Sequence, residues 1–161
     1  AASDVYKRQV LMCVLPVPAL ALSCLAPSVE RSFAQFDAAE ETYVVVHGRL
    51  TLDEKKLPKN LGLDRKPPRL TILPGRLRGS SLTKAGFVLP FDQELSLEVS
   101  CIGPWCGSAR NGEDALAFVR KDADGYALAI SPCGGAVFGN PKPEMLKQVR
   151  TCLRTGTCTA D

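Results

Sequence analysis

"DALAFVRKDADGYALAISPC", residues 114–133, is the stretch that decides the fold of this chain. Two apolar runs flank the polar segment "DADG", in which an Asp-Gly step favours a tight turn. Apolar runs joined in this way are typical of a β-hairpin, so the stretch predicts two antiparallel strands. The second strand leads directly into Cys133, which makes the end of the hairpin a candidate disulfide position.

Three further segments predict strands. Residues 42–52, "TYVVVHGRLTL", are rich in β-branched and aromatic residues. Residues 69–82, "RLTILPGRLRGSSL", predict two strand pieces separated at Pro74-Gly75. Residues 93–101, "QELSLEVSC", alternate apolar and polar side chains, which is the clearest period of two in the chain. The residues expected to face inward in this last strand are Leu95, Leu97 and Val99.

A helix is predicted at each end of the strand region. Residues 27–37 can begin a helix at the Ser28 cap, with Glu30 in the first turn. Residues 140–156 predict a second helix, capped by Asn140 and ended by Gly156. The apolar stripe expected on the second helix consists of Met145, Leu146, Val149 and Leu153. Short strands with terminal helices favour a mainly β fold built on a small closed or half-closed barrel.

Residues 1–21 are expected to be adapter-like sequence followed by a secretory signal peptide. Lys7 and Arg8 precede the apolar run "VLMCVLPVPALA", which is too short to span a bilayer as a helix. Ala19 and Ala21 supply the small residues of a cleavage site, so the predicted cut lies before Leu22. Residues 22–161 are then expected to form a single secreted or periplasmic domain.

Six cysteines follow the predicted cut, and an even number in a secreted domain indicates three disulfides with fifteen possible connectivities. The chain has no CxxC pair and a single histidine, His47, so neither a zinc site nor a cofactor is predicted. Cys24 has an alternative as the lipidated cysteine of a tethered structural envelope protein. Lipidation would leave an odd number of thiols, and Leu20 lies four residues upstream rather than the usual three.

The net charge of +3 is too small to indicate a polyanion partner by itself. Residues 55–84 are nevertheless basic, so an envelope- or polyanion-binding module is an alternative reading. Proteins that bind single-stranded nucleic acid add aromatic stacking platforms to such charge, but no aromatic residue occurs between Tyr43 and Phe87, so no nucleic acid partner is expected. His47 has no carboxylate near it in sequence, and the prediction is that the protein is not an enzyme. Trp105, beside Cys106, is expected to anchor the core.

The pattern C-x2-P-x5-F at Cys24, Pro27 and Phe33, followed by "FDAAEETYVVVHGRL", resembles the opening of tissue inhibitors of metalloproteinases and of the wider netrin-like domains. The stretch "WCG…NGEDALAFVRKDADGYALAISPC" is similar to a later part of the same family. The resemblance extends from Leu22 to Leu153. It implies an OB-fold barrel with flanking helices and a non-catalytic, protein-binding function.

The resemblance also implies the disulfides and the binding residues. It implies the pairs Cys24–Cys133, Cys101–Cys106 and Cys152–Cys158. It implies an inhibitory N-terminus composed of Leu22, Ser23, Cys24, Leu25, Ala26 and Pro27. In the family the first residue chelates the zinc of a secreted metalloproteinase through its amine and carbonyl groups, and here that residue is Leu22. Because the family has a cysteine at this position, the disulfide that it forms is absent from this chain.

Overall fold

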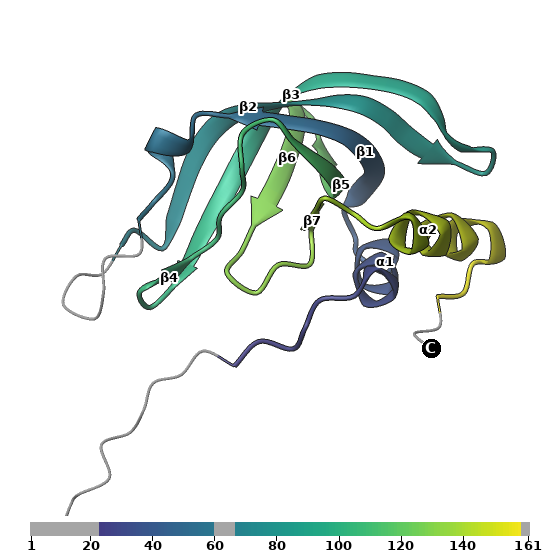
Figure 1. The fold of residues 1–161 in the computed structure, drawn as a ribbon, viewed down its shortest axis with the longest axis horizontal. Coiled ribbons are helices and arrows are strands. Elements are labelled where there is room, and N and C mark those ends of the chain that lie inside the picture. The colour runs from purple at the N-terminus through teal and green to yellow at the C-terminus, as the bar shows by residue number, and fades with distance from the viewer. Residues whose placement is uncertain (1–22, 60–66, 159–161) are drawn as a thin grey trace, which may run out of the picture.

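The computed structural model describes residues 23–59 and 67–158, so the predicted signal peptide and Leu22 lie outside the described residues (Figure 1). The fold is mainly β, as predicted, with two α-helices. The elements in chain order are α1 (Val29–Asp37), β1 (Thr42–Leu52), the short 3-10 helix η1 (Glu54–Lys56), β2 (Leu70–Thr83), β3 (Gly86–Ile102), β4 (Trp105–Cys106), β5 (Glu113–Asp122), β6 (Gly125–Ile130), β7 (Val137–Gly139) and α2 (Pro143–Thr155).

Five of the strands form a closed ring of hydrogen bonds. β1 pairs antiparallel with β2 on one side and with β5 on the other. β2 pairs antiparallel with β3, and the predicted hairpin supplies β5 and β6. The ring closes because β6 also pairs with β3, in parallel. Each ring strand therefore has a hydrogen-bonded neighbour on both sides along part of its length.

The inside of the ring is the main hydrophobic core. Strand residues that alternate along the sequence point to the same face of a sheet, and the inward set here is apolar. Leu95, Leu97 and Val99 lie there as predicted, with at most 3% of their surface exposed. Val46 of β1 and Leu128 of β6 face them and are fully buried.

A second core lies outside the ring, between β5 and the two helices. Phe118, on the outer face of β5, is 1% exposed and packs against Phe33 of α1 and Val149 of α2. The Phe118 ring stacks on Phe36 with a centroid distance of 5.1 Å. Both predicted helices thus cover one outer face of the ring, as Figure 1 shows.

The sequence predicted the N-cap of α1 correctly but not the N-cap of α2. The α1 cap is confirmed, because the Ser28 hydroxyl accepts a hydrogen bond from the Arg31 amide over 3.3 Å. The prediction that Asn140 caps α2 was wrong, because Lys142 occupies the N-cap position. Asn140 instead adopts a left-handed conformation with φ of 46°, and its side-chain amide donates to Glu113. The predicted end of α2 at Gly156 is confirmed.

The predicted break at Pro74 was also wrong, because β2 continues through it. The last pair between β1 and β2 joins Leu52 to Gly75, so Pro74 lies just beyond the part of β2 that β1 covers. A missing N–H costs no ladder hydrogen bond on an uncovered edge, and proline is tolerated there.

The strand predicted over residues 93–101 is longer than expected. β3 begins at Gly86, which makes a long hairpin that overhangs the ring and ends above α2 (Figure 1).

A pair of glycines brings β1 and β2 into close contact. Gly48 and Gly79 are directly opposite each other in the ladder. A Cβ atom at Gly79 would lie 2.1 Å from the His47 carbonyl oxygen, and one at Gly48 would lie 2.3 Å from the Arg78 oxygen. Only residues without a Cβ permit this approach, which lets the two strands curl into the ring.

Three disulfides connect the chain: Cys24–Cys133, Cys101–Cys106 and Cys152–Cys158. These are the three pairs that the resemblance implies. Cys24–Cys133 joins the segment before α1 to the loop after β6, and the other two close short local loops. Three intramolecular disulfides fit a protein that folds in an oxidising, extracytoplasmic compartment.

Candidate functional site

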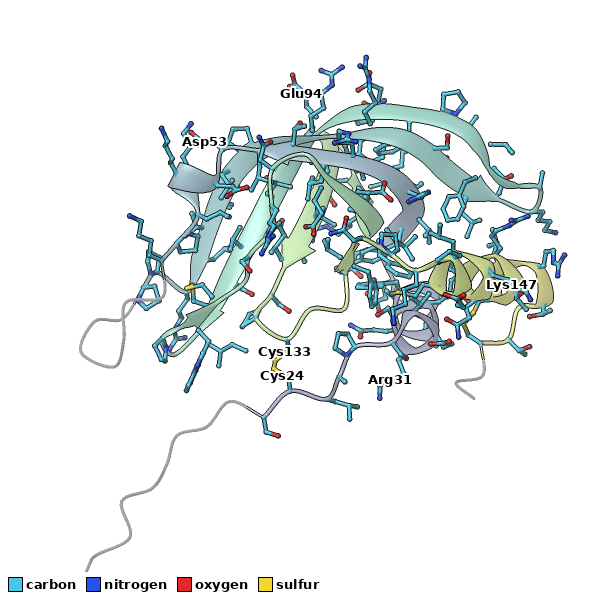
Figure 2. All side chains as sticks on the ribbon, in the orientation of Figure 1. Cys24, Arg31, Asp53, Glu94, Cys133 and Lys147 are labelled. Carbon is cyan, nitrogen blue, oxygen red and sulfur yellow. A yellow bond between two sulfur atoms is a disulfide. The ribbon has the colours of Figure 1, made fainter. Side chains whose placement is uncertain are left out.

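The N-terminal segment, residues 23–27, is extended and exposed on the surface. It has no regular secondary structure, and each of its five residues is exposed. Leu25 is the most exposed large apolar side chain of the described residues, with 76% of its surface accessible. Figure 2 shows Cys24 and Cys133 bonded beside this segment. Of the site residues that the resemblance implies, the structure therefore brings five together in one exposed strip, and Leu22 lies outside the described residues.

Contacts at both ends restrain the N-terminal segment. The Cys24–Cys133 disulfide fixes one end to the loop after β6. At the other end the Arg31 guanidinium donates a hydrogen bond to the Ala26 carbonyl oxygen. Pro27 lies so close to Gly134, which has φ of 70°, that a Cβ atom there would be 3.2 Å from the proline ring. Leu25 is thus presented to solvent from a backbone that the fold holds on either side.

A second exposed apolar element lies near the same loop. The Cys101–Cys106 disulfide closes the turn between β3 and β4, in which Ile102 pairs with Trp105. Ile102 is 48% exposed and Trp105 is half-buried, so the expectation that Trp105 anchors the core was wrong. Gly107 follows this turn, and a Cβ atom there would lie 2.1 Å from the Ile130 carbonyl oxygen. The turn therefore packs directly against the strand end that leads to Cys133.

Because the Cys24 sulfur is bonded to Cys133, it has no free thiol to accept a lipid in this structure. The disulfide thus occupies the position on which the lipid-tether alternative depends.

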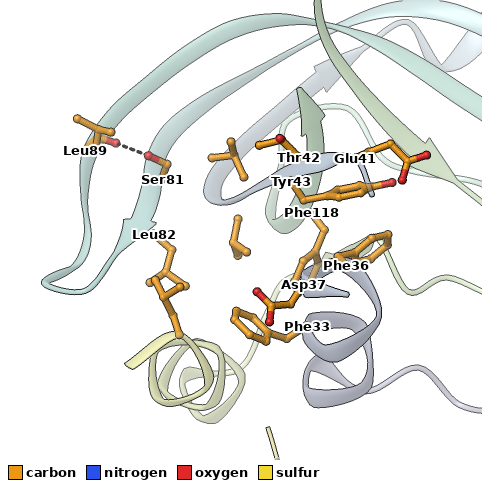
Figure 3. A pocket seen from close by; sticks show the side chains of 13 residues that line it. Phe33, Phe36, Asp37, Glu41, Thr42, Tyr43, Ser81, Leu82, Leu89 and Phe118 are labelled. Atoms are coloured by element: carbon orange, nitrogen blue, oxygen red, sulfur yellow. Dashed lines mark hydrogen bonds between the residues drawn. The ribbon is translucent and has the colours of Figure 1, made fainter. Parts of the chain in front are cut away.

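A pocket of about 410 Å³ opens between α1, α2 and the overhanging hairpin (Figure 3). Its floor is apolar and includes Phe33, Phe36 and Phe118. Asp37 points into it, and Glu41 stands at its edge, whereas its lining contains no Lys, Arg or His. The pocket can accommodate a small apolar group, and its lining also includes the hydroxyl groups of Thr42, Tyr43 and Ser81 and the carboxylates of Asp37 and Glu41.

His47 is satisfied by a partner that the sequence alone did not indicate. Its Nε2 lies 2.9 Å from an Asp114 carboxylate oxygen on the neighbouring strand β5. Ser80 is directly opposite His47 on β2. Within the described ranges, no hydrogen bond joins the Ser80 hydroxyl to the imidazole, so the nucleophile–base contact of a hydrolytic triad is not formed.

The basic segment 55–84 does not form one surface. Lys55 and Lys56 lie in η1, next to Asp53, and Figure 2 places Asp53 at the opposite end of the molecule from Lys147 of α2. Arg65 and Lys66 lie outside the described residues.

The arginines in the middle of the basic segment are already paired. Arg76 and Arg78 both donate to Asp92, over 2.7 and 2.9 Å. The hydrogen bond from Arg76 is the largest cause that lowers the pKa of Asp92 below its ordinary value. These two arginines are therefore poor candidates for holding a polyanion.

The last cation of the segment lies beside three cations of α2. Lys84 lies at the turn between β2 and β3, where it lines a cleft with Lys147, Arg150 and Arg154 of α2. From the sequence, only the apolar stripe of α2 was predicted to have a role. The basic residues of α2 recur at spacings of three and four, and this pattern was the available signal that they share one face.

Across residues 23–59 and 67–158, no group of three or more His, Cys, Asp or Glu side chains is arranged to hold a metal ion. In the same part of the chain, neither helix is long and apolar enough to cross a membrane. No protein-family model, curated protein or solved structure matches this chain.

Proposed function

We propose that this protein is an extracytoplasmic, non-catalytic binding domain whose protein partner docks on the N-terminal segment 23–27. The observation that carries the proposal is Leu25. A large aliphatic side chain with 76% exposure has no stabilising role in the monomer, and the surrounding backbone is fixed by a disulfide and a hydrogen bond. Single exposed apolar residues are common on protein surfaces, so the support for an interface comes from the combination of Leu25 with the restraint of its backbone.

Restraint of the segment favours binding for an entropic reason. A free terminus must lose its conformational freedom when it binds, and that loss subtracts from the affinity. The Cys24–Cys133 disulfide and the contact of Pro27 with Gly134 limit this freedom before the partner arrives. The turn at Ile102 and Trp105 offers further apolar area, with Ile102 48% exposed and Trp105 half-buried, and tryptophan is enriched among the residues that dominate binding energy.

The proposal includes the family. A five-strand ring in which β3 and β6 are parallel, covered by helices, supports an OB-type barrel of the netrin-like kind. If the domain acts as tissue inhibitors of metalloproteinases do, the partner is a secreted zinc metalloproteinase. The chelating groups are then the amine and carbonyl of Leu22, and the segment 23–27 lies along the protease cleft beside the metal.

The test compares two proteins in activity assays against several secreted zinc metalloproteinases. One begins at Leu22, and the other carries one extra alanine before it. Zinc chelation predicts inhibition by the first protein and none by the second, because the added residue displaces the free amine from the metal. Equal inhibition by both would exclude chelation while retaining a protein interface.

The Leu25→Ser variant tests the interface itself. It should weaken any inhibition by about tenfold or more, since burial of a leucine side chain contributes about 1.5–3 kcal/mol. Val88→Ser is the matched control, because Val88 is also an exposed aliphatic residue, at 59%, on the overhanging hairpin. Inhibition that survives Leu25→Ser unchanged would refute the interface at Leu25, and no inhibition by any form would refute the metalloproteinase proposal.

A further inference from the structure

A cluster of cations lies where the turn of the overhanging hairpin meets α2. The four members of this cationic cluster are Lys84, Lys147, Arg150 and Arg154. Together with Ala85 and Thr151 they line a cleft of about 450 Å³ that no carboxylate lines. The hairpin and the helix are in direct contact here, because a Cβ atom at Gly86 would lie 3.3 Å from the Arg150 side chain.

Within the part of the chain that the structure describes, the side chains of the cationic cluster form no ion pair, and Glu30 and Glu144 line a neighbouring cleft with Lys147. Among the described residues, none of the four makes an ion pair or a side-chain hydrogen bond. The arginines of the sheet behave differently: Arg76 and Arg78 are bonded to Asp92, and Arg120 is bonded to two carboxylates. Over the described ranges, the cationic cluster is therefore unlike these paired arginines but shares the lack of an ion pair with other surface cations such as Lys55, Lys56 and Lys121.

Concentrating like charges in one place has a cost for the fold. On α2, Lys147 and Arg150 are three positions apart and Arg150 and Arg154 are four apart, so the three charges lie on one face and repel each other. Arg154, in the last turn, is compensated by the carbonyl end of the helix. Lys147 and Arg150 lie outside the last turn, so the carbonyl end of the helix does not compensate their charges. An external anion would relieve the repulsion and bind in the cleft.

Exposed apolar side chains on the same hairpin indicate which anion this is. Val88 and Leu89 follow the turn closely and are 59% and 58% exposed. A surface that combines Lys and Arg with exposed aliphatic residues is suited to the boundary between phosphate head groups and acyl chains.

We propose that the cationic cluster binds the phosphate groups of an anionic phospholipid surface, with Val88 and Leu89 contacting the boundary of the acyl chains. This inference does not rest on the proposed function. Figure 2 shows Lys147 on α2 and Cys24 beside the loop after β6, so the cationic cluster and the N-terminal segment are separate surfaces. Each cation near an anionic surface contributes about a fivefold gain in binding, equivalent to about 1 kcal/mol.

The experiment measures co-sedimentation of the mature chain with two kinds of vesicle. One is pure phosphatidylcholine, and the other is phosphatidylcholine mixed with phosphatidylglycerol. Binding should be confined to the second kind and should fall as salt rises, because the interaction is screened. The double variant Lys147→Gln with Arg150→Gln should bind about thirtyfold more weakly. Glutamine keeps the helix propensity close to that of the original residues, so α2 should stay folded.

The matched control is Lys55→Gln with Lys56→Gln, which removes the same net charge from η1. It should bind the mixed vesicles like the unchanged protein. Val88→Ser should weaken binding to the vesicles but leave binding of inorganic pyrophosphate, measured by calorimetry, unchanged. Equal losses from the η1 and α2 variants, or equal binding to both kinds of vesicle, would overturn the proposal. The proposal would also be overturned if a sulfated polysaccharide displaced the protein from the vesicles at equal anion concentration and if its binding depended on the same four cations.

Discussion

Removal of the Cys24–Cys133 disulfide should destabilise the protein more than removal of either short disulfide. The change is a double substitution, Cys24→Ser with Cys133→Ser. In the chain-entropy description, a cross-link stabilises by restricting the unfolded chain, and its contribution grows with the logarithm of the loop length. The two cysteines are 109 residues apart, which gives about 5 kcal/mol. The same relation gives about 2 kcal/mol for Cys101–Cys106, which are 5 residues apart.

The native structure makes this comparison clean. Cys24 is exposed and lies in a segment with few contacts, so its substitution leaves the two hydrophobic cores intact. The assay is equilibrium unfolding in urea under non-oxidising conditions, with Cys101→Ser plus Cys106→Ser as the comparison. The unfolded chain without the long cross-link should also be less compact, so the dependence of the unfolding free energy on urea should steepen. A loss for Cys24–Cys133 no larger than the loss for Cys101–Cys106 would refute the entropic reasoning.

Three other substitutions test the packing and the charges. Phe118→Ala should lower the free energy of unfolding by about 3–5 kcal/mol, because it empties the centre of the core between β5 and the helices, and urea unfolding measures it. Gly79→Ala should cost about 1–3 kcal/mol in the same assay, since its Cβ would collide with the His47 carbonyl oxygen. Hydrogen bonds from Arg120 hold the pKa of Asp122 below its ordinary value of 3.8, so the native state binds a proton there less tightly than the unfolded chain does. The ionised Asp122 carboxylate therefore stabilises the folded state at pH values above its ordinary pKa. This stabilisation is lost as the pH falls through the lowered pKa. Arg120→Gln should therefore flatten the acid side of a plot of stability against pH, and an unchanged acid side would contradict the assignment.

Local patterns in the sequence predicted the individual elements well. β1 occupies the predicted residues 42–52, and the predicted tight turn forms between β5 and β6, with Ala123 and Asp124 between the paired Asp122 and Gly125. Alternation in β3 predicted which residues face inward but not which strand lies beside them. The parallel pairing of β3 with β6 depends on contacts between residues distant in sequence, and no local signal specifies it. Pro74 was misread for the same reason, because its effect depends on whether a neighbouring strand covers it.

The two candidate surfaces differ in how far the sequence predicted them. The N-terminal segment 23–27 was predicted because its residues are contiguous and resemble a family motif. The cationic cluster was not predicted, because Lys84 and Arg150 meet only after the hairpin has folded over α2. In the sequence, Lys84 belongs to the same basic segment as Arg76 and Arg78. In the structure those two arginines are paired with Asp92, and Lys84 is not.

Closure of the ring through β1 and β5 affects how the chain folds during its synthesis and export. A strand near the amino end, β1, has its final partner only when residues 113–122 are available. During synthesis or export from the amino end, β1 thus exists for a time with an open edge and with its valine run, Val44 to Val46, uncovered. Such a segment can pair with the same segment of another molecule. The interval before β5 emerges is therefore the stage at which this protein is most dependent on chaperones or on a low local concentration of nascent chains.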